Sequence, residues 1–190
     1  MRTFLLLSWM ALPVAGVAYH YGPGQDRLVL DDVARIVATA ESAVADEDWA
    51  FAVEQYGQAI AKLPEGHSDV SRVLRLERAK AQMNAQELPS AARDLESLVD
   101  ELDGDASAPS QLKAEGRRAL ANSQFYMTWL LRLEGKTRAE WEPQIEAARQ
   151  NYRLLAESTD NATEKQDLEA AIRLERLELE DLQGLPLPSQ

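Results

Sequence analysis

The residues best suited to catalysis or metal binding are scarce in this chain of 190 residues. It has no Cys and only two His, His20 and His67. Zinc sites, iron–sulfur clusters and serine-type triads are built from Cys or His side chains. With no Cys and two His, the chain has almost no residues from which to form any of these sites. The sequence also contains no Gly-x-Ser-x-Gly, His-Glu-x-x-His or Gly-x-x-x-x-Gly-Lys motif. We therefore expect no catalytic residue, no metal site and no cofactor, and we expect both His to lie in loops.

Acidic side chains offer a second kind of chemistry. The run at residues 100–105 (DELDGD) carries the oxygen ligands that calcium prefers, but it lacks the alternating spacing and the distal Glu of a calcium-binding helix–loop–helix. We interpret it as a solvated loop between helices. Asp46 and Asp48 are a carboxylate pair of the kind that hydrolases use. We expect a solvated turn there, and we keep a carboxylate-dependent hydrolase of the cell envelope as a functional alternative.

The composition is that of an acidic helical protein. The formal net charge of −12 at pH 7 argues against nucleic acid as a partner, because its phosphates would be repelled. Only 9 Gly and 8 Pro interrupt the sequence, and the most common residues, Ala and Leu, both favour helices. The length predicts one compact domain or one short repeat array.

Residues 1–21 differ in kind from the rest of the chain. Arg2 is followed by the apolar run Phe4–Ala18, which is shorter than the roughly 20 residues of a bilayer-spanning helix. The pattern is typical of a secretory signal peptide. The alternative is an uncleaved N-terminal membrane anchor that continues through Tyr19. Either one predicts a protein that is exported or anchored in the inner membrane, on the periplasmic side, whereas a buried helix of a cytoplasmic domain is the third interpretation.

The rest of the chain divides into three predicted parts. Residues 22–30 are expected to be a linker, because Gly22, Pro23 and Gly24 interrupt helices. Residues 31–183 form the predicted helical domain, and residues 184–190 form a tail after the helix-breaking Gly184.

Start and stop signals divide the helical domain into seven predicted helices. Gly104 is the expected left-handed stop of the fourth helix, and Gly135 is expected to close the fifth. The spacings of Thr137 to Glu140 and of Thr163 to Gln166 are those of capping boxes. Pro143 leaves two alternatives for the sixth helix, a kink or a start at the proline itself. The expected helices run over residues 31–45, 49–63, 68–85, 89–102, 110–134, 137 or 143 to 158, and 163–183.

Two segments are similar to each other when the chain is shifted by 39 positions. Each matched pair joins two apolar or small residues, which is the expected result if each helix places a small side chain where two backbones approach closely. The pairs are Val37 with Leu76, Ala40 with Ala79, Val44 with Met83, Trp49 with Leu88, Ala52 with Ala91, Tyr56 with Leu95, and Ala59 with Leu98.

The first segment resembles a tetratricopeptide repeat. Ala52, Tyr56, Ala59 and Pro64 have the spacing of the second helix of that repeat, and Ala40 stands where the family has the small residue of its first helix. By this resemblance, residues 33–66 are one unit and residues 72–102 a second. A degenerate third unit carries Ala121, Ala148, Tyr152 and Leu155. The block 125–150 is also similar to uncharacterised exported bacterial repeat proteins.

The resemblance implies an all-α fold, a short solenoid of antiparallel helix hairpins with a C-terminal capping helix. Paired helices of this kind bury their apolar faces only by stacking on the next pair. In the family, the first helix of each pair lines a groove that binds a partner. The groove positions implied here are Val37, Glu41, Val44, Leu76, Lys80, Met83, Asn84, Arg118, Asn122 and Phe125.

The expected function is that of a non-catalytic protein–protein interaction scaffold. Its partner is expected to be another protein, bound through an acidic or an apolar peptide segment. Basic residues at 72–80 and 117–118 would form a positive groove or, alternatively, pair with nearby Glu on ordinary helix faces. An aromatic cluster would pack between helices or line the groove; its members are Phe125, Tyr126, Trp129, Trp141 and Tyr152. A subunit of a membrane-associated complex, built as an irregular helical bundle, is the other functional alternative.

Overall fold

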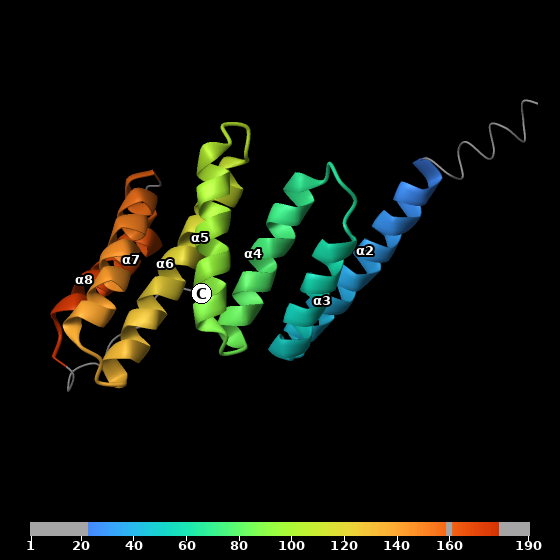
Figure 1. The fold of residues 1–190 in the computed structure, drawn as a ribbon. Helices are drawn as coiled ribbons and strands as arrows, with labels where there is room; N and C mark the ends of the chain where they lie inside the picture. Colours follow the sequence, from blue (N-terminus) through green and yellow to red (C-terminus); the bar gives the residue numbers. More distant parts are fainter. Residues whose placement is uncertain (1–22, 159–160, 179–190) are drawn as a thin grey trace, which may run out of the picture.

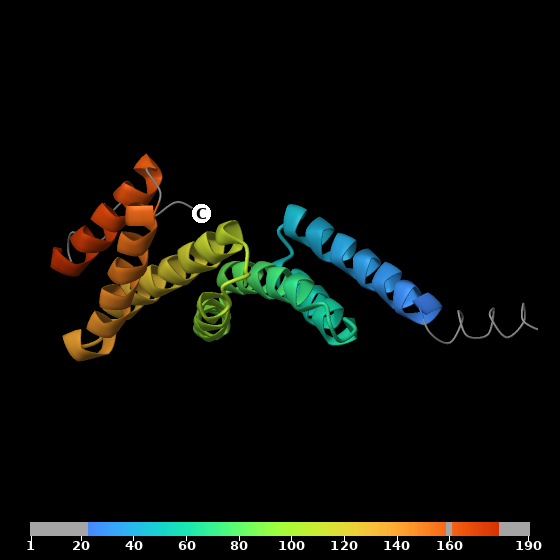
Figure 2. The same cartoon turned by 90° about the horizontal axis from the view of Figure 1, so that it is seen from above.

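The protein is all-α and its helices stack in chain order. The computed structural model describes residues 23–158 and 161–178, with side chains from Arg27 onward. Every helix packs against the next one along the chain, so the predicted solenoid of antiparallel hairpins is confirmed. Figure 1 shows this row, and Figure 2 shows from above that it is bent. The described helices are α2 (Pro23–Ala45), α3 (Trp49–Lys62), α4 (Ser68–Asn84), α5 (Leu88–Gly104), α6 (Ser110–Leu133), α7 (Arg138–Ser158) and α8 (Ala162–Arg176).

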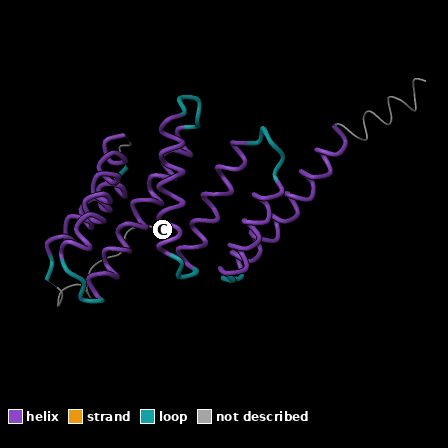
Figure 3. The backbone as a smooth tube through the Cα atoms, in the orientation of Figure 1, coloured by secondary structure: helices purple, strands orange, loops and turns teal. Residues whose placement is uncertain are grey.

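Three hairpins close with the same tight turn. Glu47, Gln86 and Gly135 each have a left-handed backbone, with φ of 59°, 65° and 70°. In each turn the following N–H donates to the carbonyl five residues back: Asp48 to Ala43 (2.8 Å), Glu87 to Gln82 (2.9 Å) and Lys136 to Leu131 (3.0 Å). This is the Schellman closure of a helix C-terminus. The first two turns are 39 residues apart, so the sequence period reappears in the backbone geometry. The turns are the short loops in Figure 3.

The residues matched by the shift of 39 lie mostly inside the protein. Ala40, Ala52, Ala79 and Ala91 are fully buried, each within a helix of the first two hairpins. A side chain of this size lets neighbouring helices approach closely, since packing distance follows the residues at the contact. The larger residues of the same pattern, Tyr56, Leu95 and Leu98, are buried as well.

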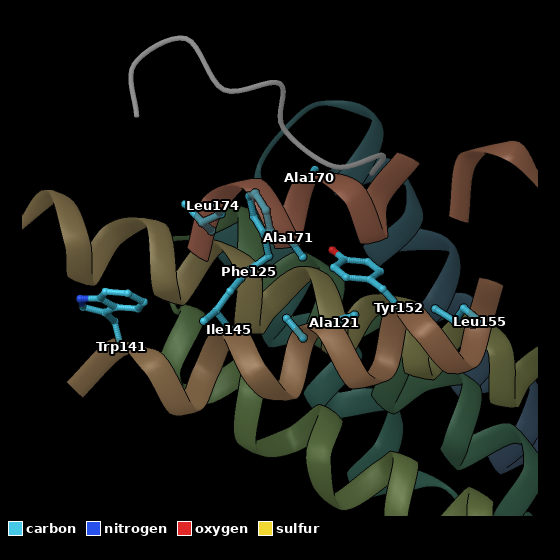
Figure 4. Close-up of a cluster of buried hydrophobic side chains, with 10 residues drawn as sticks. Ala121, Phe125, Trp141, Ile145, Tyr152, Leu155, Ala170, Ala171 and Leu174 are labelled. Atoms are coloured by element: carbon cyan, nitrogen blue, oxygen red, sulfur yellow. The ribbon is translucent and has the colours of Figure 1, made fainter. Parts of the chain in front are cut away.

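The third hairpin and α8 share one apolar cluster. Figure 4 shows Phe125 from α6, Ile145 and Tyr152 from α7, and Leu174 from α8 converging in it. The α8 helix therefore covers the exposed face of the last hairpin, as the predicted capping helix would. The apolar spacing of this segment predicts an inward stripe of Leu168, Ala171, Ile172, Leu179 and Leu182. Ala171 is buried, and Leu168 and Ile172 are half-buried, whereas Leu179 and Leu182 lie outside the described residues.

The linker predicted at residues 22–30 is wrong from Pro23 onward. The α2 helix begins at Pro23 and runs without interruption to Ala45. Proline is well tolerated in the first turn of a helix, because its missing N–H would have no intrahelical partner there and its φ is already helical. The domain therefore begins eight residues before the predicted boundary at Asp31.

Three predicted helix ends also differ. Gly104 is the last residue of α5 without a left-handed φ, and the chain turns instead at Asp105, whose carboxylate accepts the Ser107 N–H at 2.8 Å. Asn161, rather than a Thr163–Gln166 capping box, caps α8 by accepting the Thr163 N–H at 3.0 Å.

The α8 helix ends at Arg176 instead of continuing to residue 183. The guanidinium of Arg132 donates to the carbonyls of Leu174 and Leu177, so side-chain donors replace the backbone donors that a longer helix would supply. By contrast, one half of the predicted Thr137–Glu140 capping box is present. Glu140 accepts the Thr137 N–H at 2.9 Å, whereas the Glu140 N–H donates to the Thr137 carbonyl. The α7 helix runs through Pro143.

Among the described helices, none is long and apolar enough to cross a membrane. The signal peptide or anchor predicted at residues 1–21, and His20 with it, lie outside the described residues.

The shared turn geometry predicts that Gln86→Gly stabilises the protein. A non-glycine residue at positive φ is strained, whereas Gly adopts this conformation freely. We expect the free energy of unfolding to rise by about 0.5–1 kcal/mol in urea titrations. The control is Ala85→Gly, one residue earlier at φ −75°, which should lower it instead. Equal effects of the two substitutions would contradict the proposed role of the turn.

Candidate functional site

A groove with a volume of about 950 Å³ runs along one side of the solenoid. Helices α4 and α6 provide most of its walls, and these two first helices of successive hairpins also contact each other directly. The lining is mainly apolar, with two acidic and two basic side chains. The lining residues are Val44, Trp49, Glu77, Lys80, Ala81, Met83, Asn84, Gln86, Leu88, Glu115, Arg118, Ala119, Asn122, Tyr126, Trp129 and Leu130.

Most of the residues expected on the middle and last first helices do meet in this groove. Lys80, Met83 and Asn84 line it from α4, and Arg118 and Asn122 line it from α6. Val44 contributes from the C-terminal part of α2. These side chains were expected together because the first helix of each pair was expected to line the groove, and they do lie together in the structure.

The other expected groove residues lie elsewhere. Leu76 and Phe125 are buried in the core, while their neighbours Glu77 and Tyr126 line the groove. Successive side chains on a helix point in directions about 100° apart. At these two places, the helix face that lines the groove is therefore one residue further along the chain than predicted. Val37 packs against the apolar core of the first hairpin, and Glu41 is exposed outside the groove.

Three large side chains of the groove were not predicted to line it as a set. Tyr126, Trp129 and Leu130 follow Asn122 by four, seven and eight residues, so all lie on one face of α6. In the sequence, these residues continue the helical spacing that begins with Arg118 and Asn122, so the same helix face could have been extended to them. The aromatic-groove alternative includes Tyr126 and Trp129, but not Leu130.

The aromatic residues of α6 divide between core and groove. Phe125 is fully buried and meets Tyr126 in an edge-to-face contact, with 5.9 Å between ring centroids. Tyr126 and Trp129 are half-buried, packing against the core on one side and lining the groove on the other. Both alternatives for the aromatic cluster are thus partly realised, by different residues.

The basic residues are paired with carboxylates, so they do not form a positive groove. Lys80 donates to Glu77 at 2.7 Å, and Arg118 pairs with Glu164 of α8. Arg117 binds Asp103 at 2.7 Å. Arg72, Arg75 and Arg78 all pair with acidic residues on or just after α5.

Buried polar contacts join the groove to the helices behind it. Glu164 is only 1% exposed, and its Oε1 accepts the Arg118 Nε–H at 3.0 Å. The Tyr152 hydroxyl donates to Asn122 Oδ1 at 2.7 Å. Burial, together with the nearby charge of Asp167, raises the pKa of Tyr152 far above its usual range, so it remains a neutral donor. Two polar residues of the groove are thereby fixed by α7 and α8.

Four of the carboxylates considered for catalysis or metal binding, Asp48, Glu101, Asp103 and Asp105, have structural partners. Asp48 caps α3 by accepting the Phe51 N–H at 3.3 Å. Glu101 and Asp105 both bind Arg72 at 2.7 Å. His67 occupies the N-cap position of α4 without a side-chain cap bond. Across residues 23–158 and 161–178, no group of three or more His, Cys, Asp or Glu is placed to hold a metal ion.

Comparison with known proteins gives no family assignment. The sequence matches no protein-family model, and no curated protein matches it significantly. The tetratricopeptide resemblance therefore rests on the residues alone, and the solenoid architecture on the structure.

The Arg118–Glu164 pair predicts a specific pattern of stabilities. Arg118→Met leaves a buried carboxylate without its cation and should cost about 3 kcal/mol of unfolding free energy. Adding Glu164→Gln removes the unpaired charge, so the double variant should recover part of that loss, as measured by urea denaturation of all four proteins. Additive losses would show that the two side chains do not interact.

The Arg72 cluster predicts an acid-sensitive contribution to stability. Hydrogen bonds from Arg72 and Arg75 lower the pKa of Glu101, and bonds from Ser107 and Arg72 lower that of Asp105. Groups with lowered folded pKa values stabilise the fold above their unfolded values of about 4, and this contribution is lost as the pH falls further. Arg72→Met should therefore lower the urea midpoint at pH 7.

That difference between wild type and Arg72→Met should shrink by pH 3. Arg93→Met serves as the control, since exposed Arg93 bonds only the Ser90 hydroxyl among the contacts described. A gap of the same size at both pH values would contradict the prediction.

Proposed function

We propose that this protein is a non-catalytic interaction scaffold whose groove binds an apolar segment of another protein. The observation that carries this proposal is the groove itself, about 950 Å³ in volume and lined mainly by apolar residues of successive first helices. Concave, mostly apolar surfaces with a few fixed polar groups are typical of binding sites.

The dimensions of the groove suit a peptide segment. Its lining on α6 extends from Glu115 to Leu130, which corresponds to about 22 Å along the helix axis. An extended peptide of about seven residues, or an amphipathic helix of about four turns, has this length. Either would place apolar side chains against Met83, Ala119 and Trp129.

The charges of the groove support an apolar rather than an acidic segment. Lys80 and Arg118 already have carboxylate partners within the protein. Binding an acidic peptide would require it to compete with those partners, and paired surface charges add little affinity. The exposed amide of Asn84 and the rim charges would then fix the orientation of the bound segment.

The proposed place of action is outside the inner membrane, either exported or anchored there through residues 1–21. The support is the sequence of that segment. The ordered solenoid argues against the irregular bundle that was the structural alternative. The paired carboxylates described above do not favour a hydrolase.

A photocrosslinking residue in place of exposed Asn84 tests the proposal in the full chain. Irradiation in cells should give one discrete adduct with another protein. Leu130→Glu, at a groove residue that is 41% exposed, should lower the adduct yield by about tenfold, because a charge replaces an apolar contact.

The matched control is Leu133→Glu. Leu133 is 43% exposed on the same helix but does not line the groove, so the adduct should persist. A crosslinker at Asp100, an exposed residue of α5, should give no such adduct. The same adduct from both sites, or its indifference to Leu130→Glu, would refute the proposal.

A further inference from the structure

We propose that residues 179–190 of the same chain occupy the groove and must leave it before a partner binds. Displacement of this segment by a partner rests on the proposed function. Its binding in the groove is argued from three separate observations. The segment would act as an internal competitor, so that only a partner with sufficient affinity displaces it.

The first observation is where the described chain ends. Arg132, near the end of α6, donates to the carbonyl of Leu174 in the last turn of α8 and to that of Leu177, the residue after the helix. Trp129 and Leu130, which line the groove, lie within one turn of Arg132 on the same helix. Leu177 and Trp129 also pack against the same apolar cluster. Leu177, next to the last described residue, therefore lies near the end of the groove that Trp129 and Leu130 form.

The second observation is the chemistry of the segment, LEDLQGLPLPSQ at residues 179–190. It contains four Leu and two Pro, and its only charged side chains are Glu180 and Asp181. An apolar groove of net neutral lining suits such a segment. No Lys or Arg of the segment would compete for the carboxylates that hold Lys80 and Arg118.

The third observation is reach. Twelve residues span about 37 Å even at the rise of a polyproline helix, and more when fully extended. The lining along α6 corresponds to about 22 Å. The segment is therefore long enough to cover the groove from the Leu130 end to the Glu115 end without any movement of α8.

An intramolecular photocrosslink tests this directly. Benzoylphenylalanine replaces Leu187 in the full chain, and the attachment site is mapped by mass spectrometry after irradiation. We expect attachment within the chain to groove residues, with Met83 and Leu130 as the nearest acceptors. Leu130→Glu should reduce the yield by about tenfold, and Leu133→Glu should leave it unchanged.

Attachment outside the groove would overturn the inference. So would an adduct of twice the chain mass, because it would assign the contact to a second copy. A yield that is the same in the Leu130→Glu and Leu133→Glu variants would overturn it as well.

A second measurement separates this inference from the proposed function. The double variant Leu185→Asp and Leu187→Asp, with Ser189→Asp as the charge control, is combined with the Asn84 crosslinker. The partner adduct should increase several-fold in the double variant only. If the partner adduct forms but the segment does not map to the groove, only the present inference fails. If the segment maps to the groove and no partner adduct forms even in the double variant, the proposed function fails instead.

Discussion

The architecture depends on two-sided burial: each internal helix packs against the helix before it and the helix after it. Small side chains make this possible in the first two hairpins, where Ala40, Ala52, Ala79 and Ala91 are fully buried. A larger residue at any of these positions would push two backbones apart, and overpacking is destabilising. Because stacking alone buries the apolar faces, the last hairpin needs α8 to cover it. The hairpin order, the capping role of α8 and the position of the groove all depend on this two-sided packing.

The groove is a consequence of the same packing. The first helices α4 and α6 contact each other. Their side chains that face away from the core therefore lie on one shared surface, which forms the groove. Apolar residues such as Met83 and Trp129 remain half-buried there, facing both the core and the solvent. A surface of this kind gains stability when a further apolar segment covers it. This is the physical basis for assigning the binding role to the groove.

Ion pairs hold the helices in register and at the same time neutralise the basic side chains that take part in them. Arg72 connects the start of α4 with the end of α5, and Arg118 connects α6 with α8. Arg132 performs a related task with backbone carbonyls and also lies over the Trp141 ring, 4.8 Å from its centroid. Arginine suits these sites because its planar fork binds several acceptors at once. The basic residues thus serve the fold, which removes the reason to expect an acidic ligand.

The sequence by itself determined the helices, their hairpin order and their buried small residues, because periodicity, caps and glycine stops are local signals. It predicted six of the residues that line the groove, including Met83 and Arg118. Only the tertiary structure decided that Leu76 and Phe125 face inward, since a rotation of one residue along a helix depends on how neighbours pack. It also decided the charge of the groove. Whether Arg118 serves a ligand or Glu164, 46 residues away in sequence, is set by the stacking of α8 on α6 and α7.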